Sequence, residues 1–248
     1  GLISAGGDWT FTSMGSGTLV TTGSTVAFVG GNPNNSAIAG SHTLNNVTFD
    51  SESGAMIYAI GAGTTITVNG DLVMNGTNGF AINTGTLDVK GNITATSTNA
   101  STSGTAAIIV SGGSAQTITQ SGAGHLPSGT FTVNKSSNSL TLASNVILEG
   151  ALAVTSGTLS QGASYNMTVS GTTTVGASGI WTNTGTGDIT LGGNVANAGT
   201  ITLDSGAAGC GHNDDIVLNS TTSAQRTWSG AGTFTLNDLA VSWMAGSM

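Results

Sequence analysis

The residues best suited to chemistry in this sequence lie in one short stretch near its C-terminal end. Cys210, His212, Asp214 and Asp215 follow one another closely, and thiolate, imidazole and carboxylate groups are all metal ligands. Their spacing, C-x-H-x-D-D, matches no closed zinc pattern, and a second ligand pair is missing elsewhere in the chain. The two aspartates also immediately precede the apolar run 216–218, where a solvated turn is expected. The sequence therefore favours a polar corner loop over a metal site, and we expect no cofactor.

Two other arrangements could support catalysis, and neither is specific. Glycoside hydrolysis needs two carboxyl groups about 5–10 Å apart, a separation at which Asp50 could meet Glu52 or Asp71. The 11 acidic residues spread over 248 positions would give many such pairs in any stacked fold. The histidines are far apart in the sequence, and no serine or cysteine has a nucleophile-elbow context. We therefore expect no enzymatic activity.

Hydroxyl side chains form a third candidate surface. Thr-x-Thr runs begin at Thr65, Thr117, Thr172 and Thr200, and such runs could build a flat hydroxyl array like those of ice-binding solenoids. Threonine is also simply favoured on exposed strand faces. Because these runs do not share one phase of the repeat described next, the sequence does not predict a common array.

The element that must position these residues is a short alternating strand, ended by a glycine, that returns about every 21 residues. Three sets of apolar positions recur within each period, as a coil with three strands requires. No window sustains the i, i+3, i+4, i+7 spacing of a helix. The sequence predicts an all-β fold, a parallel β-helix (β-solenoid) of about 21 residues per coil and three strands per coil, as a single domain over residues 1–248.

Two apolar ladders illustrate this periodicity. Leu159, Ile180 and Ile201 follow one another at the interval of the repeat and are predicted to stack on one another. The valines at the same interval form two series, and we expect them to build the core ladder: Val26, Val47, Val68, Val89, Val110, Val133, Val154 and Val175.

Composition limits the partners. Only 6% of residues are charged, against roughly a quarter in ordinary soluble proteins. The net charge is −8, and Lys90, Lys135 and Arg226 are too few to form a basic patch, so we expect no nucleic-acid partner. No apolar run approaches the roughly twenty residues of a membrane helix, which argues against membrane insertion. Residues 1–7 lack a signal-peptide pattern, so we expect any export signal to have been removed already.

Several segments carry a family resemblance. Residues 139–146 (SLTLASNV), 152–159 (LAVTSGTL) and 233–241 (TFTLNDLAV) look like the strand repeats of very large bacterial surface proteins. The chain thereby resembles filamentous-haemagglutinin and autotransporter-adhesin passengers. This resemblance implies a right-handed β-helix and an exported, extracellular or cell-surface molecule with a structural or adhesive role. It supplies strands and turns only, so no functional residue can be carried over.

Aromatic residues near both ends suggest where such a coil could associate with itself. Trp9 and Phe11 lie near one end, and Trp228 and Trp243 near the other. Open solenoid ends invite strand pairing unless they are capped. We therefore expect a non-enzymatic structural protein of the bacterial surface or extracellular matrix, either an excerpt of a longer fibre or a subunit that stacks into one. An adhesin that binds glycan or a host surface is one alternative, and a β-helical carbohydrate-active enzyme is the other.

Overall fold

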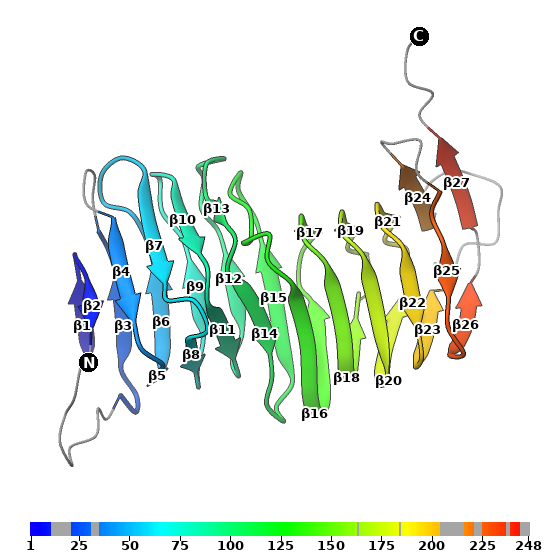
Figure 1. Cartoon of the computed structure of the whole chain (residues 1–248), viewed down its shortest axis with the longest axis horizontal. Helices are drawn as coiled ribbons and strands as arrows, with labels where there is room; N and C mark the ends of the chain where they lie inside the picture. The colour runs from blue at the N-terminus through cyan, green and yellow to red at the C-terminus, as the bar shows by residue number, and fades with distance from the viewer. Residues whose placement is uncertain are drawn as a thin grey trace, which may run out of the picture. The chain divides into compact units, whose positions relative to one another are not determined.

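Parallel strands joined by turns account for most of the chain in the computed structural model (Figure 1). The structure describes residues 1–10, 21–30, 35–162, 164–183, 185–203, 216–220, 225–236 and 239–243. Among these residues there is no helix, and the strands stack as a β-solenoid with coils about 22 residues apart. The predicted all-β solenoid is confirmed. Its right-handedness stays a prediction of the family resemblance.

The chain divides into two compact units, Gly1–Gly112 with Thr119–Gly129, and Gly113–Ile118 with Thr130–Met248. Both units have the same architecture, and the single domain over residues 1–248 stays a prediction.

In the first unit the strands stack in three columns, 1A, 1B and 1C. Column 1A contains β1 (Leu2–Ala5), β3 (Thr25–Phe28), β6 (Asn46–Phe49), β9 (Leu72–Met74) and β12 (Ile93–Ala95). Column 1B contains β5 (His42–Leu44), β8 (Thr65–Val68), β11 (Thr86–Val89) and β14 (Ala107–Val110). Column 1C contains β2 (Trp9–Thr10), β4 (Ser36–Ala39), β7 (Met56–Ile60), β10 (Phe80–Asn83) and β13 (Ser103–Gly104).

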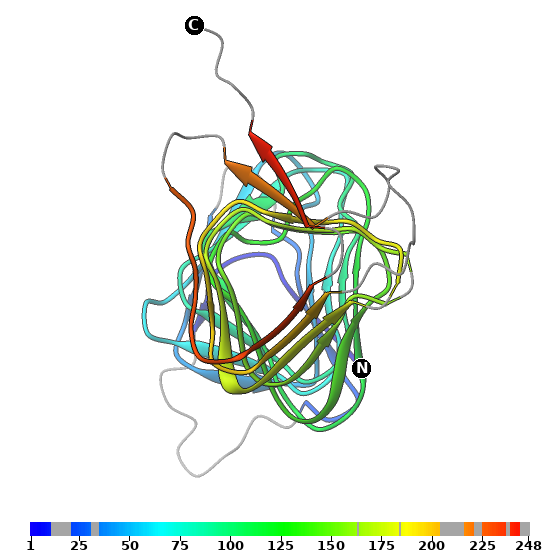
Figure 2. The same cartoon turned by 90° about the vertical axis from the view of Figure 1, so that its right-hand side faces the viewer.

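The second unit also has three columns, 2A, 2B and 2C, and in Figure 2 its coils from green to yellow follow a common outline. The long strands β16 (Phe131–Leu142), β18 (Leu152–Ser160) and β20 (Thr173–Asn183) turn a corner, so their first halves lie in 2B and their second halves in 2A. Column 2A also contains β15 (Gln116–Gln120, which begins in this unit), β23 (Thr200–Leu203) and β26 (Thr233–Leu236). Column 2B continues with β22 (Val195–Asn197) and β25 (Trp228–Ser229). Column 2C contains β17 (Val146–Leu148), β19 (Met167–Val169), β21 (Ile189–Leu191), β24 (Ile216–Ser220) and β27 (Leu239–Trp243).

Alternation along each strand places the core. In β9, Leu72 and Met74 are buried while Val73 between them is half-buried, because successive strand side chains point to opposite faces. Each coil therefore sends apolar side chains inward from all three faces, onto the equivalent residues of the coils above and below. The three strands per coil predicted from the sequence are confirmed in both units.

All eight valines of the predicted core ladder are buried. In the second unit the ladder runs as predicted, since Val133 pairs with Val154 and Val154 with Val175.

In the first unit the valine ladder is wrong at one step. Val47 lies in column 1A and pairs with Leu72, whereas Val68 lies in column 1B and pairs with Leu44. The coil from Leu44 to Val68 is longer than the sequence period. Val68 and Leu72 lie close together in the sequence, on either side of one corner. Because this coil is longer than 21 residues, the position 21 residues after Val47 is Val68 of column 1B, and not Leu72 of column 1A, which pairs with Val47.

The ladder predicted through Leu159, Ile180 and Ile201 is wrong by one residue at its middle. Leu159 pairs with Trp181, and Trp181 pairs with Ile201. The coil from Leu159 to Trp181 is one residue longer than the period, and such a shift moves every side chain to the opposite face of a strand. Trp181 is therefore fully buried, whereas Ile180 is 41% exposed.

Candidate functional site

The polar cluster of Cys210, His212, Asp214 and Asp215 lies outside the described residues. Among the residues that the structure does describe, no group of three or more histidine, cysteine, aspartate or glutamate side chains could hold a metal ion.

The acidic residues considered as a catalytic pair make hydrogen bonds to backbone. Asp50 accepts the Ser51 N–H through Oδ1 at 2.6 Å. Asp71 accepts the Asn92 N–H of the next coil at 2.7 Å, and its own N–H donates to Asn46 Oδ1 of the preceding coil at 3.0 Å. The Asp71 and Asn46 side chains therefore join successive coils at one corner of the first unit.

The same arrangement recurs in the second unit. The Asn166 N–H donates to Asn145 Oδ1, and the Asp188 N–H donates to Asn166 Oδ1, both at 2.9 Å. We call these two series the corner amide ladders. Each ladder satisfies backbone donors where the strands end and fixes which coil lies against which.

Trp9, one of the two aromatic residues expected near one end, contacts the interior of the first unit. The Trp9 ring meets Phe28 edge to face with centroids 5.6 Å apart, and it lies 6.3 Å from the ring of His42. Trp9 is half-buried, and Phe11 lies outside the described residues.

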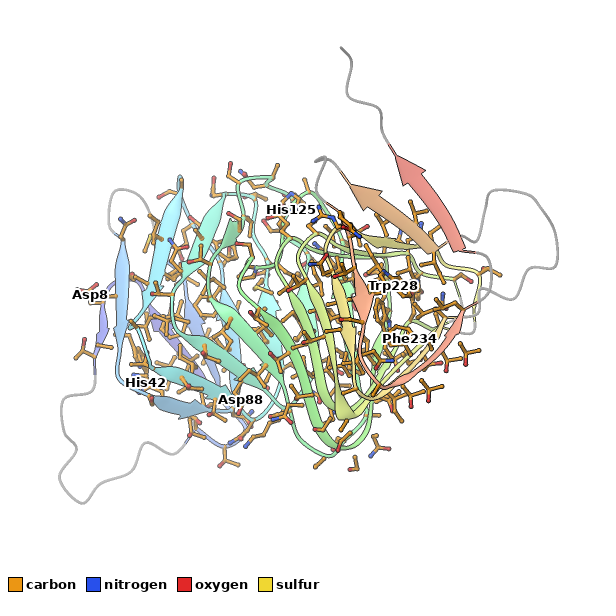
Figure 3. All side chains as sticks on the ribbon, turned by 45° about the vertical axis from the view of Figure 1, so that its right-hand side comes forward. Asp8, His42, Asp88, His125, Trp228 and Phe234 are labelled. Atoms are coloured by element: carbon orange, nitrogen blue, oxygen red, sulfur yellow. The ribbon has the colours of Figure 1, made fainter. Side chains whose placement is uncertain are left out.

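Near the other end, Trp228 and Phe234, both labelled in Figure 3, stack with ring centroids 5.5 Å apart. Both side chains are half-buried. The backbone of Trp243 pairs with Ser220 in column 2C, and its side chain is not described. The predicted role of these aromatic residues in self-association stays a prediction.

A buried lysine, which the sequence did not single out, lies in β16 of the second unit. Lys135 is 2% exposed, and its Nζ donates to the carbonyl oxygen of Ser114 at 2.8 Å and to Oε1 of the buried Gln116. Burial lowers the pKa of Lys135, because removing an ammonium from water disfavours its charged form. Its place between coils identifies it as part of the coil-to-coil hydrogen bonding.

The candidate binding surface is the outer side of column 2A, which we call the hydroxyl face. Its two rows are set by the strand register, with partners facing one another on successive coils. One row is Ser139, Thr158, Ile180, Thr200 and Thr233, and the other is Thr117, Thr141, Ser160, Thr182, Thr202 and Thr235.

This face was not predicted from the sequence, because a single period of about 21 residues was assumed for all coils. Thr117 and Thr202, from two of the Thr-x-Thr runs, belong to the same row although they do not share one phase of the 21-residue period. The coils that separate the members of this row differ in length, and the coil from Thr202 to Thr235 is much longer than the rest. Aligning each coil on its buried central residue would have found the rows. The runs at Thr65 and Thr172 lie elsewhere, in columns 1B and 2B.

Comparisons with protein-family models, with curated proteins and with solved structures find no match to this chain. Within the described parts of the chain, no helix is long and apolar enough to cross a membrane.

Proposed function

We propose that this chain is a non-enzymatic structural module of a bacterial cell-surface or extracellular protein, in which stacked coils build a fibre. The observation that carries this proposal is the direction of the hydrogen bonds. Backbone ladders on three faces, the corner amide ladders and Lys135 all connect one coil to the next. A stack of this kind extends by adding further coils, each of which contacts only its neighbours.

Export to the cell surface is part of the proposal. Its support is the resemblance of the strand repeats to those of filamentous-haemagglutinin and autotransporter passengers. Low charge is consistent with a structural role, because stacked coils with only 6% charged residues bring few like charges together between neighbouring rungs.

The strand β1 offers a place where a second copy could join. It is the first strand of column 1A and pairs with β3, leaving one backbone edge without a neighbour among the described strands of that column. Its side chains Leu2 and Ile3 are 71% and 36% exposed. An edge strand with exposed apolar side chains is a template for pairing with another chain.

Concentration-dependent assembly tests this proposal. We expect sedimentation and negative-stain electron microscopy of the purified chain to show end-to-end filaments at high concentration. Leu2→Lys should shift assembly to a concentration at least about tenfold higher, because a charged residue on an edge strand opposes pairing. Ile57→Lys is the matched control, since Ile57 is also exposed (37%) but lies in β7 between two paired strands. Discrete, unassociated particles at every concentration would refute the filament proposal.

A further inference from the structure

The hydroxyl face is a two-dimensional lattice of one kind of group. Every position in its two rows carries a threonine or serine hydroxyl, with the exception of Ile180. Neighbouring strands lie about 4.7–4.9 Å apart, and residues i and i+2 of one strand about 6.6–6.8 Å apart. The register therefore repeats the hydroxyls at both intervals, along two nearly perpendicular directions.

The composition of this face is specific to column 2A. The corresponding outer row of column 2B reads Thr132, Ala153, Thr174, Ala196 and Ser229. The outer row of column 2C begins with Ile147, Thr168 and Thr190 and continues with Val217. A general preference of exposed strands for threonine would have enriched all three faces alike.

Several hydroxyls of this face are available to an outside partner. Ser139 Oγ and Thr141 Oγ1 form a hydrogen bond with each other at 3.2 Å and so use part of their own hydrogen-bonding capacity. In the described part of the chain, the Thr182, Thr200 and Thr202 hydroxyls make no hydrogen bond to another protein group. The two rows contain no charged residue, so the face does not orient water around ions.

We propose that the hydroxyl face binds ice. The water oxygens at a face of hexagonal ice repeat, along two perpendicular directions, at intervals close to the strand spacing and to the i, i+2 spacing. Each threonine offers a hydroxyl that can take a lattice position and a methyl group that can fit beside it. A β-branched side chain is restricted at χ1, so the array loses little conformational entropy on binding.

The same features argue against the other occupants. Sugar rings are generally bound on exposed aromatic side chains, and the aromatic residues of this column face the other way. Trp181 is fully buried, and Phe234 packs on Trp228. A second copy of the chain would have to join two uncharged polar faces that are already hydrated, with only Ile180 as an exposed apolar anchor.

Ice-affinity partitioning of the full chain tests the proposal, with ice-recrystallisation inhibition as a second readout. Thr182→Tyr places a bulky ring in the middle of one row, between Ser160 and Thr202. Thr174→Tyr makes the same change on the same strand β20, but on the outer side of column 2B. Circular dichroism and thermal unfolding confirm that both variants are folded.

The wild type should concentrate in the ice fraction and inhibit recrystallisation. Thr182→Tyr should need a concentration at least about tenfold higher for the same inhibition, whereas Thr174→Tyr should match the wild type. A folded wild type that stays in the liquid fraction would overturn the proposal. So would equal losses in both variants, or retention on crystalline cellulose or chitin without retention on ice. These readouts do not depend on filament formation, so they separate this proposal from the structural one.

Discussion

The buried phenol of Tyr58 should make the free energy of unfolding of the first unit fall at alkaline pH. Its side chain is fully buried among Phe28, Phe49 and Phe80, with the Phe49 and Phe80 rings 5.2 and 5.9 Å away. Its hydroxyl accepts the Gly30 N–H at 2.9 Å and donates toward the carbonyl oxygens of Phe28, at 3.0 Å, and Asp50. Burial, reinforced by the charges of Asp50 and Glu52, raises the pKa of Tyr58 from 10.0 to about 12.

This shift fixes the sign and size of the effect. Below pH 10 the phenol is protonated in the folded and the unfolded chain, and its contribution to stability is fully present. Between pH 10 and about 12 only the unfolded chain loses the proton, so the free energy of unfolding falls. Two pKa units correspond to about 2.7 kcal/mol. Tyr58→Phe should remove this fall, and at neutral pH it should cost about 1–3 kcal/mol because the Gly30 N–H loses its acceptor.

Urea unfolding of the wild type and of Tyr58→Phe across this pH range measures the difference. Tyr165→Phe is the control, because Tyr165 is 39% exposed and is the only other tyrosine. In that variant the tyrosinate absorbance reports Tyr58 alone. A midpoint near pH 10 while the circular dichroism is still native would refute the buried-phenol reasoning. So would a Tyr58→Phe variant whose stability falls as steeply as that of the wild type.

Three further predictions concern the packing of the coils. Burial lowers the pKa of Lys135, so the unfolded chain binds the proton more tightly and the unfolding free energy should rise as the pH approaches 10.5. Lys135→Met should abolish this rise in urea titrations at alkaline pH below 10.5. Gly104→Ala should lower the unfolding free energy by about 1–3 kcal/mol or more in thermal melts, because its φ is +135° and a Cβ would lie 2.0 Å from a carbonyl oxygen. Gly6→Ala is the control and should be neutral in the same melts, because the space around Gly6 is open. Trp181→Ala should cost about 3–5 kcal/mol and Ile180→Ser within about 0.5 kcal/mol. A larger loss of unfolding free energy for Ile180→Ser than for Trp181→Ala in chemical denaturation would contradict the observed register and support the one predicted from the sequence.

The sequence by itself determined the class of fold and much of the core. Runs of alternating apolar residues that end at a glycine predict short strands. Their return about every 21 residues predicts that these strands stack in successive coils. The burial of all eight ladder valines follows from the same pattern. The sequence was sufficient for these conclusions because its period and its alternation of apolar residues are local properties. They do not depend on which strands pair.

The tertiary structure decided the register, and with it the candidate site. The coils of column 2A differ too much in length to be aligned by a fixed period. Side chains alternate along a strand, so an error of one residue exchanges inside and outside, as it did for Ile180 and Trp181. The hydroxyl face exists only once Thr117, Thr182 and Thr202 are brought to one row by hydrogen bonds between coils. Those bonds join residues far apart in the chain, and their partners are chosen by how well the buried side chains of whole coils pack together.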